Sequence, residues 1–276
     1  EHPAVQTNVQ TLRSRGVLVL SPDTGPLASG QVGVGRFPDE GAILAALTSS
    51  FSIQTTWSDR CVLISAGPTQ EPIDPVRFLS NRSSGKMGYA LAEAARDRGA
   101  KVVLVTGPTA LPFPSGLDVI QVETAEEMHH AVLVRLSWAT VVIMAAAVAD
   151  FRPAVSEQRK IKKAGKASMM VELVPPPDIL EAVAQQRSTQ VVVGFAAETD
   201  GLLEQAQDKL RRKQLDLILA NAVGVPGTGF GADDNAGILV AADGSITELP
   251  VMSKREMAER ILDGVEKVRP RSAWVV

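Results

Sequence analysis

The sequence predicts an α/β protein with a Rossmann-like, doubly wound and mostly parallel sheet that includes a late β-hairpin. Short β-branched apolar runs recur at 62–65, 102–106, 119–122, 141–145, 191–195 and 215–220. Amphipathic helical segments separate these runs, which is typical of βαβ units whose helices cover both faces of a parallel sheet. The pair Asp243-Gly244 interrupts the apolar segment 238–249 and predicts the hairpin turn.

Helix starts and one long loop can be placed between the strands. Thr124 and Glu127 form a capping box, and Ser253 and Glu256 repeat the pattern before the last helix. A helix expected at 87–98 has one apolar face and stops before a glycine. The polar stretch 150–167 then breaks the alternation, which is uncommon in a compact domain unless the stretch covers a site.

The sequence divides into a short first part and a main domain. Residues 1–47 contain an apolar run at 16–20 and a helical patch at 43–47, and they look incomplete alone. We expect a linker at 48–59, a main domain at 60–270 and a tail at 271–276. The chain starts without Met or a leader segment, so we expect a fragment of a longer protein.

Composition excludes several function classes. The 276 residues carry 28 Lys and Arg against 31 Asp and Glu, a net charge of -3, so no general field attracts nucleic acid. No apolar run reaches the roughly 20 residues that span a bilayer, so no membrane association is expected. Cys61 is the only cysteine, which excludes an intrachain disulfide or a cysteine metal cage and favours a cytoplasmic location. His129 and His130 lack zinc-site spacing.

Two segments indicate a site for an anionic ligand. Gly67 follows the first strand of the main domain, where it either lets a nucleotide approach the backbone or makes an ordinary tight turn. Segment 77–88 places Arg77, Arg82 and Lys86 around small residues that open a helix, which favours anion binding or, alternatively, a polar cap with solvated cations. A P-loop is rejected because Ser80 replaces its first glycine.

Further candidates follow the fourth and fifth strands. Small residues at 144–149 let a planar ligand lie against the backbone, and Asp150 either binds a divalent ion or ligand amide or starts a turn. The basic run 160–166 is a solvated surface or a phosphate-covering flap. Phe195 either stacks on a base or joins the core.

Together these motifs resemble the bacterial phosphopantothenoylcysteine synthetase family over about residues 62–268. The resemblance is carried by Gly67-Pro68-Thr69, the segments 74–78 and 80–88, Ala146 to Asp150, Lys160 to Lys163 and Gly194 to Thr199. Residues 1–47 resemble the end of the flavin-dependent decarboxylase that bacteria fuse upstream. By this resemblance FMN belongs only to a preceding domain whose flavin-binding body is absent from this chain.

The resemblance implies a ligase of coenzyme A biosynthesis. Its reaction joins 4'-phosphopantothenate and cysteine, consumes CTP with Mg²⁺, and passes through an acyl-cytidylate with release of pyrophosphate and CMP. It also implies a homodimer formed through the ligase domain, because a family arginine matched by Arg77 reaches the substrate phosphate of the neighbouring protomer.

The same resemblance implies the site residues. The catalytic residues would be Lys160, the flap lysine of cytidylylation, and Asn81, which contacts the pantothenate portion and acts on the acyl-cytidylate. Substrate contacts would come from Arg77, Asn81, Ala146, Ala147 and Asp150, with Asp150 also the candidate metal ligand. The implied nucleotide contacts are Gly67, Met144, Ala145, Ala146, Asp150, Lys160, Pro177, Asp178, Ile179, Leu180, Phe195, Lys209 and Lys213.

Two other functions fit a similar architecture. A nicotinamide-dependent dehydrogenase is disfavoured, because the second strand ends at Thr106 and not at an acid that could hold a ribose hydroxyl. A non-catalytic nucleotide-sensing module is the other alternative, and turnover with purified components distinguishes it from an enzyme.

Overall fold

The computed structural model describes residues 2–15, 17–27, 30–50, 55–163, 168–198, 201–222, 229 and 231–268. The chain forms two compact units, Glu1–Gln54 and Thr55–Val276, which are described separately. Their boundary falls inside the expected linker, but both ends of that linker belong to regular elements. Residues 48–50 complete a helix, and residues 55–57 form a short 3-10 helix. The expected tail, 271–276, lies outside the described residues.

The first unit contains two helices and a two-stranded sheet. Helix α1 (Pro3–Ser14) was not predicted; it begins with a proline, and His2 caps it by accepting the Ala4 N–H. Strands β1 (Asp23–Pro26) and β2 (Val32–Arg36) pair antiparallel, and helix α2 (Glu40–Ser50) extends the helical patch expected at 43–47. Apolar side chains such as Val32 and Phe37 are exposed, so this unit buries little of its own apolar surface.

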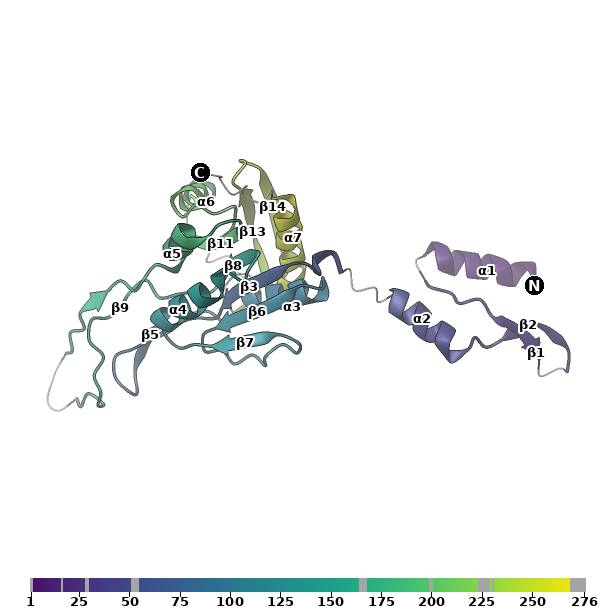
Figure 1. Ribbon diagram of the computed structural model, residues 1–276, viewed down its shortest axis with the longest axis horizontal. Coiled ribbons are helices and arrows are strands. Elements are labelled where there is room, and N and C mark those ends of the chain that lie inside the picture. Colours follow the sequence, from purple (N-terminus) through teal and green to yellow (C-terminus); the bar gives the residue numbers. More distant parts are fainter. Residues whose placement is uncertain are drawn as a thin grey trace. The chain divides into compact units, whose positions relative to one another are not determined.

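The second unit is built on an eight-stranded sheet in the order β14-β13-β12-β11-β8-β3-β6-β7 (Figure 1). Its strands are β3 (Cys61–Ala66), β6 (Lys101–Thr106), β7 (Asp118–Gln121), β8 (Val141–Met144), β11 (Val191–Glu198), β12 (Leu217–Ala222), β13 (Asp234–Ala241) and β14 (Ile246–Ser253). The strands from β12 to β7 pair in parallel, whereas β13 and β14 form the late antiparallel hairpin around Asp243 and Gly244. The predicted fold class is therefore confirmed.

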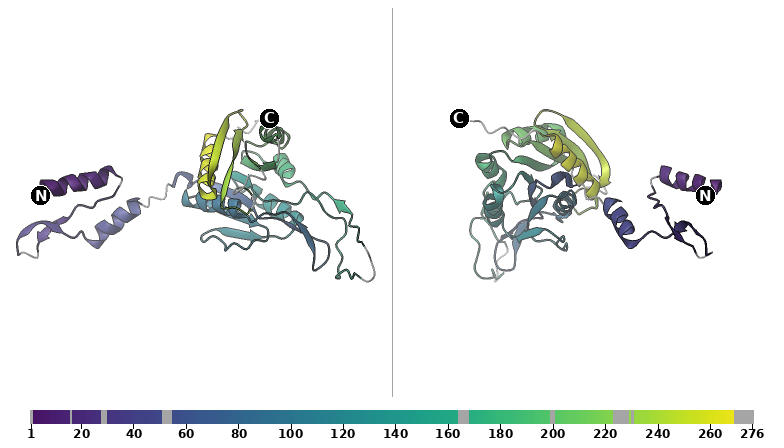
Figure 2. Two further views of the ribbon diagram at one scale, coloured as in Figure 1. Left: turned by 180° about the vertical axis from the view of Figure 1, so that it is seen from behind. Right: turned by 45° about the vertical axis from the view of Figure 1, so that its right-hand side comes forward.

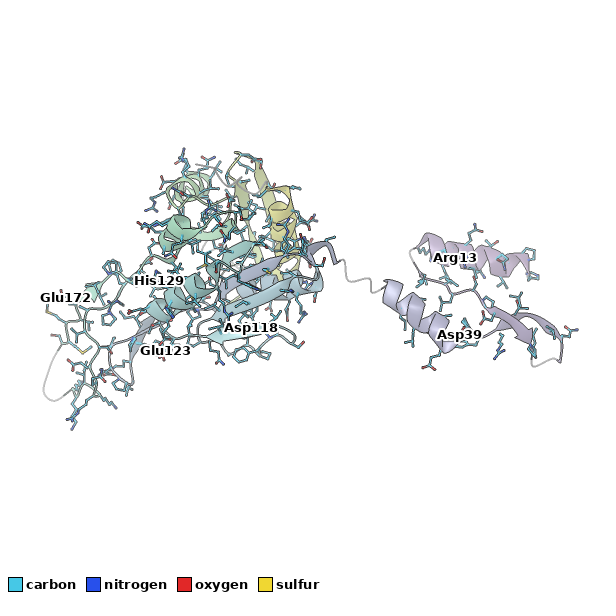
Figure 3. The ribbon with its side chains drawn as sticks, in the orientation of Figure 1. Arg13, Asp39, Asp118, Glu123, His129 and Glu172 are labelled. Atoms are coloured by element: carbon cyan, nitrogen blue, oxygen red, sulfur yellow. The ribbon has the colours of Figure 1, made fainter. Side chains whose placement is uncertain are left out.

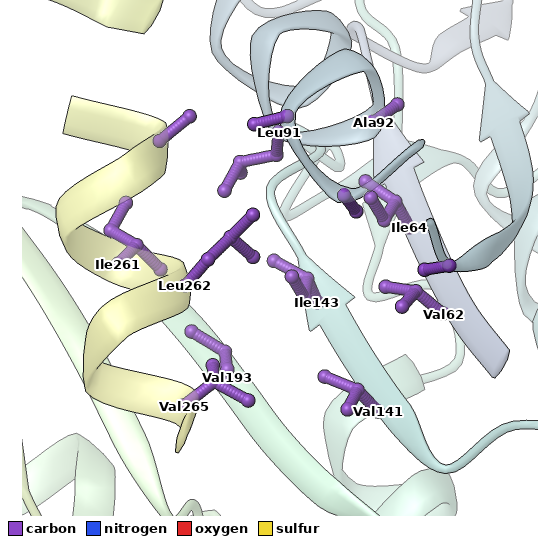
Figure 4. Packing of buried hydrophobic residues seen from close by; sticks show 14 of the residues in the cluster. Val62, Ile64, Leu91, Ala92, Val141, Ile143, Val193, Ile261, Leu262 and Val265 are labelled. Carbon is purple, nitrogen blue, oxygen red and sulfur yellow. The ribbon is translucent and has the colours of Figure 1, made fainter. Parts of the chain in front are cut away.

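Helices cover both faces of this sheet. Helices α3 (Lys86–Asp97) and α7 (Lys254–Lys267) pack on one face, where Leu91 and Leu262 meet Ile64 and Ile143 of the central strands (Figure 4). Helices α4 (Ala125–Leu136), α5 (Ile179–Gln186) and α6 (Leu202–Arg212) contribute to the core on the other face. The parallel strands are buried on both sides, which explains their continuous apolar runs.

The short helix η1 (Thr55–Trp57) belongs to this core and not to a linker. The Trp57 side chain is buried, its indole N–H donates to Glu266 Oε1 at 2.6 Å, and the Arg98 guanidinium lies 5.7 Å from the ring centroid. An aromatic ring that fills a core position and bonds a polar partner brings its flanking backbone into the domain.

Two antiparallel pairs outside the sheet were not predicted. Strands β4 (Gln70–Pro72) and β5 (Phe78–Ser80) form a hairpin, and β9 (Arg152–Pro153) pairs with β10 (Leu173–Val174) at the base of an excursion over residues 151–174. Both views in Figure 2 show the described parts of this excursion, 151–163 and 168–174, projecting beyond the sheet. It corresponds to the long polar stretch in the sequence.

The strand order reverses between β3 and β8. Strand β3 pairs with β6 on one side and with β8 on the other, and the chain reaches β8 only after forming β7 at the far edge. In open α/β sheets the crevice at the carboxyl ends of strands at such a reversal is the usual ligand site. Among the described helices, none is long and apolar enough to span a membrane.

Candidate functional site

A cleft of about 870 Å³ opens at the carboxyl ends of these central strands. It brings together segments 81–88, 144–150, 175–180 and 195–197, together with residues from α6, β12, β13 and α7. The predicted site residues that line it are Asn81, Met144, Ala145, Ala146, Ala147, Asp150, Pro177, Asp178, Ile179, Leu180, Phe195, Lys209 and Lys213. Gly67, Arg77 and Lys160 do not line it. The volume lies within the range of small-molecule sites.

Gly67 does not line the cleft but hydrogen-bonds to a residue that does. Its φ is +73°, and its carbonyl oxygen accepts the Ala147 N–H at 2.9 Å. A Cβ on Gly67 would lie 2.9 Å from Thr109 Cγ2, and a Cβ on Gly85 would meet the same methyl group at 2.7 Å. These glycines therefore allow the turn after β3 to approach the start of α3.

Asn81 fixes the loop that follows β8. Its Nδ2 donates to the carbonyl oxygens of Ala147 at 3.3 Å and Val148 at 3.0 Å. Thr69 Oγ1 accepts the Ala149 N–H at 3.0 Å, so two side chains hold the same loop from neighbouring segments. Asp150 follows this loop and is exposed at the cleft. The backbone that faces a ligand here is held in place by specific hydrogen bonds.

The start of α5 and one face of α6 form another wall. Asp178 caps α5 by accepting the Glu181 N–H at 3.0 Å, and its other oxygen accepts from Lys213 Nζ at 2.5 Å. Burial acts in the opposite direction, but the hydrogen bond and charge of Lys213 hold the Asp178 pKa below its usual value. Lys209 Nζ donates to the Phe195 carbonyl oxygen at 2.9 Å. The two lysines that the sequence places on one helix face thus reach the same cleft.

Arg77 and Lys160 belong to a region beside the cleft. The Arg77 guanidinium binds the carboxylate of Asp74 and donates to the Ile161 carbonyl oxygen at 2.9 Å. Asp74 also accepts the Ile161 N–H at 3.1 Å. The hydrogen bonds from Arg77, supported by backbone N–H groups, hold the Asp74 pKa far below its usual range. Lys160 is exposed and directly precedes this anchored residue.

The cleft also contains residues that the predicted set omitted, including Asn221, Asn235 and Lys254. Lys254 is the first residue of α7 and is 8% exposed. A sequence signal for it existed, because the capping pair Ser253 and Glu256 places a lysine where the helix dipole disfavours positive charge. Lys86, named in the anion-binding segment, occupies the same position on α3.

Metal-binding candidates are sparse. Within the ranges that the structure describes, no group of three or more His, Cys, Asp or Glu side chains is placed to hold a metal ion. His129, labelled in Figure 3, lies on α4 and is not among the residues that line the cleft. Asp150 is therefore not part of a protein cage among the described residues, and the other aspartate that lines the cleft, Asp178, is paired with Lys213. The basic run continues to Lys166, which lies outside the described residues, as does Thr199.

Comparisons with known proteins agree with this architecture. A family model described as the DNA/pantothenate metabolism flavoprotein C-terminal domain matches residues 57–268. The coenzyme A biosynthesis bifunctional protein CoaBC of Bacillus subtilis is 43% identical over 268 residues, and that of Mycobacterium tuberculosis H37Rv is 44% identical over 279. Each alignment covers 96% of this chain but 66% of the relative.

A solved structure gives the same result. The crystal structure of the C-terminal domain of a CoaBC protein superposes with a TM-score of 0.66 at 41% sequence identity, covering 76% of this chain and 95% of that one. The matched family model covers most of the second unit, and the curated alignments extend over nearly the whole chain. The chain therefore belongs to the family of DNA/pantothenate metabolism flavoprotein C-terminal domains.

Proposed function

We propose that this chain is a phosphopantothenate-cysteine ligase that uses CTP. The observation that carries the proposal is the convergence of Asn81, Asp150 and the lysines of α6 on one cleft at the strand-order reversal. These positions match the residues that the resemblance assigns to substrate and nucleotide. The pathway named for the bifunctional relatives, coenzyme A biosynthesis, supports the same activity.

The proposed reaction has two steps. A carboxylate oxygen of 4'-phosphopantothenate attacks the α-phosphorus of CTP, and the bond to the β-phosphate breaks, so pyrophosphate leaves with the bonding electron pair. The amine of cysteine then attacks the acyl carbon of the acyl-cytidylate; CMP leaves and the amine loses a proton. Because negative charge accumulates in the first step, cations near the phosphates lower its barrier.

The nucleotide base is proposed to bind at the wall made by α5 and α6. The segment from Pro177 to Leu180 contains the start of α5, and Phe195 is half-buried within β11 in the same cleft. Backbone groups here can distinguish cytosine from adenine, because the two bases expose different donor and acceptor edges. Lys209 and Lys213 keep this wall in place through Phe195 and Asp178.

Asn81 and Lys160 are proposed to serve different steps. Since both Asn81 N–H bonds are directed to backbone carbonyl oxygens, its amide oxygen is the group left to receive a hydrogen bond from the acyl-cytidylate. Lys160 is proposed to reach the α-phosphate from the excursion that Asp74 and Arg77 anchor. In a homodimer Arg77 would additionally contact the substrate phosphate of the neighbouring protomer; its side chain is 42% exposed.

Mg²⁺ is proposed to enter with the nucleotide. Magnesium typically binds one or two carboxylates together with substrate phosphates, and the exposed carboxylate of Asp150 at the cleft fits that mode of binding. The ion would neutralise phosphate charge during transfer. FMN is proposed to belong to a fused decarboxylase domain that precedes this ligase unit in the longer relatives.

The direct test is turnover by the purified chain. It is incubated with 4'-phosphopantothenate, cysteine and Mg²⁺, with CTP or ATP in parallel, and pyrophosphate and the amide product are measured by mass spectrometry. We expect amide formation with CTP and release of CMP. Folded, dimeric protein that forms no amide with either nucleotide would contradict the proposal, and nicotinamide-dependent oxidation would favour the dehydrogenase instead.

A further inference from the structure

Two helices that begin at the cleft each carry a lysine at their first residue. Lys86 begins α3 and Lys254 begins α7, and both side chains line the cleft. Positive charge in the first turn opposes the helix dipole, so these lysines are not explained by helix stability. Neither side chain is needed for the roles proposed above.

Within the part of the chain that the structure describes, Lys254 is a buried cation without a direct ion pair, and the carboxylates of Asp233 and Asp234 act on its charge only at longer range. Its Nζ donates to the carbonyl oxygens of Gly229 at 3.0 Å and Ala232 at 2.5 Å, which are neutral acceptors and use two of its three donors. Among the described residues, no carboxylate forms an ion pair with it. Burial lowers the pKa of Lys254, and the charge of Lys86 lowers it further. A buried charge of this kind is costly unless an opposite charge arrives to compensate it.

Lys86 has only an exposed partner. Its Nζ donates to the Gly231 carbonyl oxygen at 3.0 Å and to Asp233 Oδ1 at 2.7 Å. The Asp233 side chain is 89% exposed, and an ion pair with so exposed a partner contributes little to stability, so Lys86 can exchange this carboxylate for a stronger anion. The local charge is therefore two ammonium groups against the exposed carboxylates of Asp233 and Asp234, neither of which lines the cleft.

We propose that Lys254 and Lys86 together bind a terminal phosphate group of a substrate in this cleft. The inference rests on the proposed function and extends it, because the wall proposed for the base is built from α5, β11 and α6, whereas this site is built from α3 and α7. The first turn of α3 adds backbone N–H groups to the two cations. The phosphate can come from the β- and γ-positions of the nucleotide or from 4'-phosphopantothenate.

The test is calorimetric binding to the whole chain. Wild-type protein, Lys254→Met and Lys86→Met are titrated with inorganic pyrophosphate, CTP, CMP and 4'-phosphopantothenate. Lys101→Met is the matched control, since Lys101 is an exposed lysine at the amino end of β6, on the sheet edge away from the cleft. We expect at least a tenfold loss of phosphate-ligand affinity in Lys254→Met, about a threefold loss in Lys86→Met and no change in Lys101→Met.

The ligands identify the source of the phosphate. Weaker binding of pyrophosphate and CTP with unchanged CMP assigns the site to the terminal phosphates of the nucleotide. Weaker binding of 4'-phosphopantothenate alone assigns it to the other substrate. If both cleft variants bind every ligand as the Lys101→Met control does, the proposal is wrong.

Two further measurements separate this inference from other failures. Thermal unfolding checks that Lys254→Met is folded; if it is not, Lys86→Met and the charge-retaining Lys254→Arg decide the question. Lysine-dependent pyrophosphate binding without any CTP-dependent ligation would reject the proposed function and keep the phosphate site. If the chain catalyses ligation but both lysine variants bind the phosphate ligands as wild type does, the proposed function is kept and the phosphate site is rejected.

Discussion

The floor of the cleft, which is the loop that follows β8 (145–150), and the excursion at 151–174 differ in how the rest of the chain holds them. The floor is held by side-chain hydrogen bonds: Asn81 donates to the Val148 carbonyl oxygen, and the buried Thr69 hydroxyl accepts the Ala149 N–H. The excursion has a two-residue strand pair at its base and a few bonds to the β4–β5 hairpin, including Glu157 N–H to the Ile73 carbonyl oxygen at 3.0 Å. The floor is therefore suited to hold substrates in fixed geometry, and the excursion to carry a cation to them.

The largest expected effect comes from breaking the floor. Asn81→Asp replaces an N–H donor by a carboxylate oxygen about where Nδ2 now lies, 3.0 Å from the Val148 carbonyl oxygen. Two oxygens at this distance repel each other, and the loop must move. We expect the rate of amide formation to fall about 1000-fold, since loss of one oriented donor alone costs about 100- to 1000-fold. Steady-state product formation measures it.

A second variant tests whether the loss in Asn81→Asp is specific to that amide. Ser83→Ala changes a neighbouring polar residue of the same cleft without touching that loop and is expected to reduce the rate less than tenfold. If Asn81→Asp retains more than a tenth of wild-type activity, the floor does not depend on this amide.

The next largest effect comes from the excursion. Lys160→Gln removes the proposed cation while leaving the fold intact, because the side chain is exposed. We expect pyrophosphate release to slow about 100-fold with an unchanged melting temperature. Lys162→Gln, an equally exposed lysine two residues away, is the matched control and should stay within about twofold of wild type. Equal losses in both variants would indicate a general charge effect and not a role for Lys160.

A smaller effect is expected from the anchor of the excursion. Asp74→Asn weakens the bonds to Arg77 and Ile161 but leaves the sheet untouched. We expect about tenfold lower activity and faster tryptic cleavage within 159–163, with little change in the melting temperature. Asp97→Asn, which loses a surface pair with Arg96 and Arg255, should show neither change. Unchanged cleavage in Asp74→Asn would show that the anchor does not order the excursion.

The smallest effect is a pH dependence of the same anchor. Arg77 and backbone N–H groups depress the Asp74 pKa, so the stabilisation is fully present above the ordinary aspartate value of about 4 and is lost as the pH falls toward the depressed value. Hydrogen exchange of residues 157–163 should therefore be constant between pH 6 and 8 after correction for intrinsic rates, and protection should decrease below about pH 4. Protection that declines already between pH 8 and 6 would contradict this assignment.

The sheet could be predicted because its central strands are buried and therefore appear in the sequence as short, continuous apolar runs. The exception is instructive: the strand expected at 215–220 begins only at Leu217. Gln214 adopts a positive φ where the chain leaves α6, and Asp216 turns its carboxylate to Arg187 and the Val192 N–H. These are tertiary interactions that no local pattern specifies.

The short strands and Lys254 show the limit of sequence reasoning at the site. Strands β4, β5, β9 and β10 are two or three residues long, too short for a recognisable period, and they exist because of contacts between distant segments. Lys254 was not among the predicted site residues, because its place in the cleft depends on how α7 packs against the sheet. By contrast, small residues after strand ends, such as those at 144–149, were predictable because parallel strands bring their carboxyl ends to one edge.

The account assigns the first chemical step to Lys160 and the second to Asn81. The most direct test is a single-turnover experiment with CTP, 4'-phosphopantothenate, cysteine and Mg²⁺ in which pyrophosphate, acyl-cytidylate and amide are measured together. The account predicts that Lys160→Gln slows the pyrophosphate burst, whereas Asn81→Asp retains a burst and accumulates acyl-cytidylate that is poorly converted to amide. Equal loss of the burst in both variants, with no acyl-cytidylate trapped in either, would contradict it.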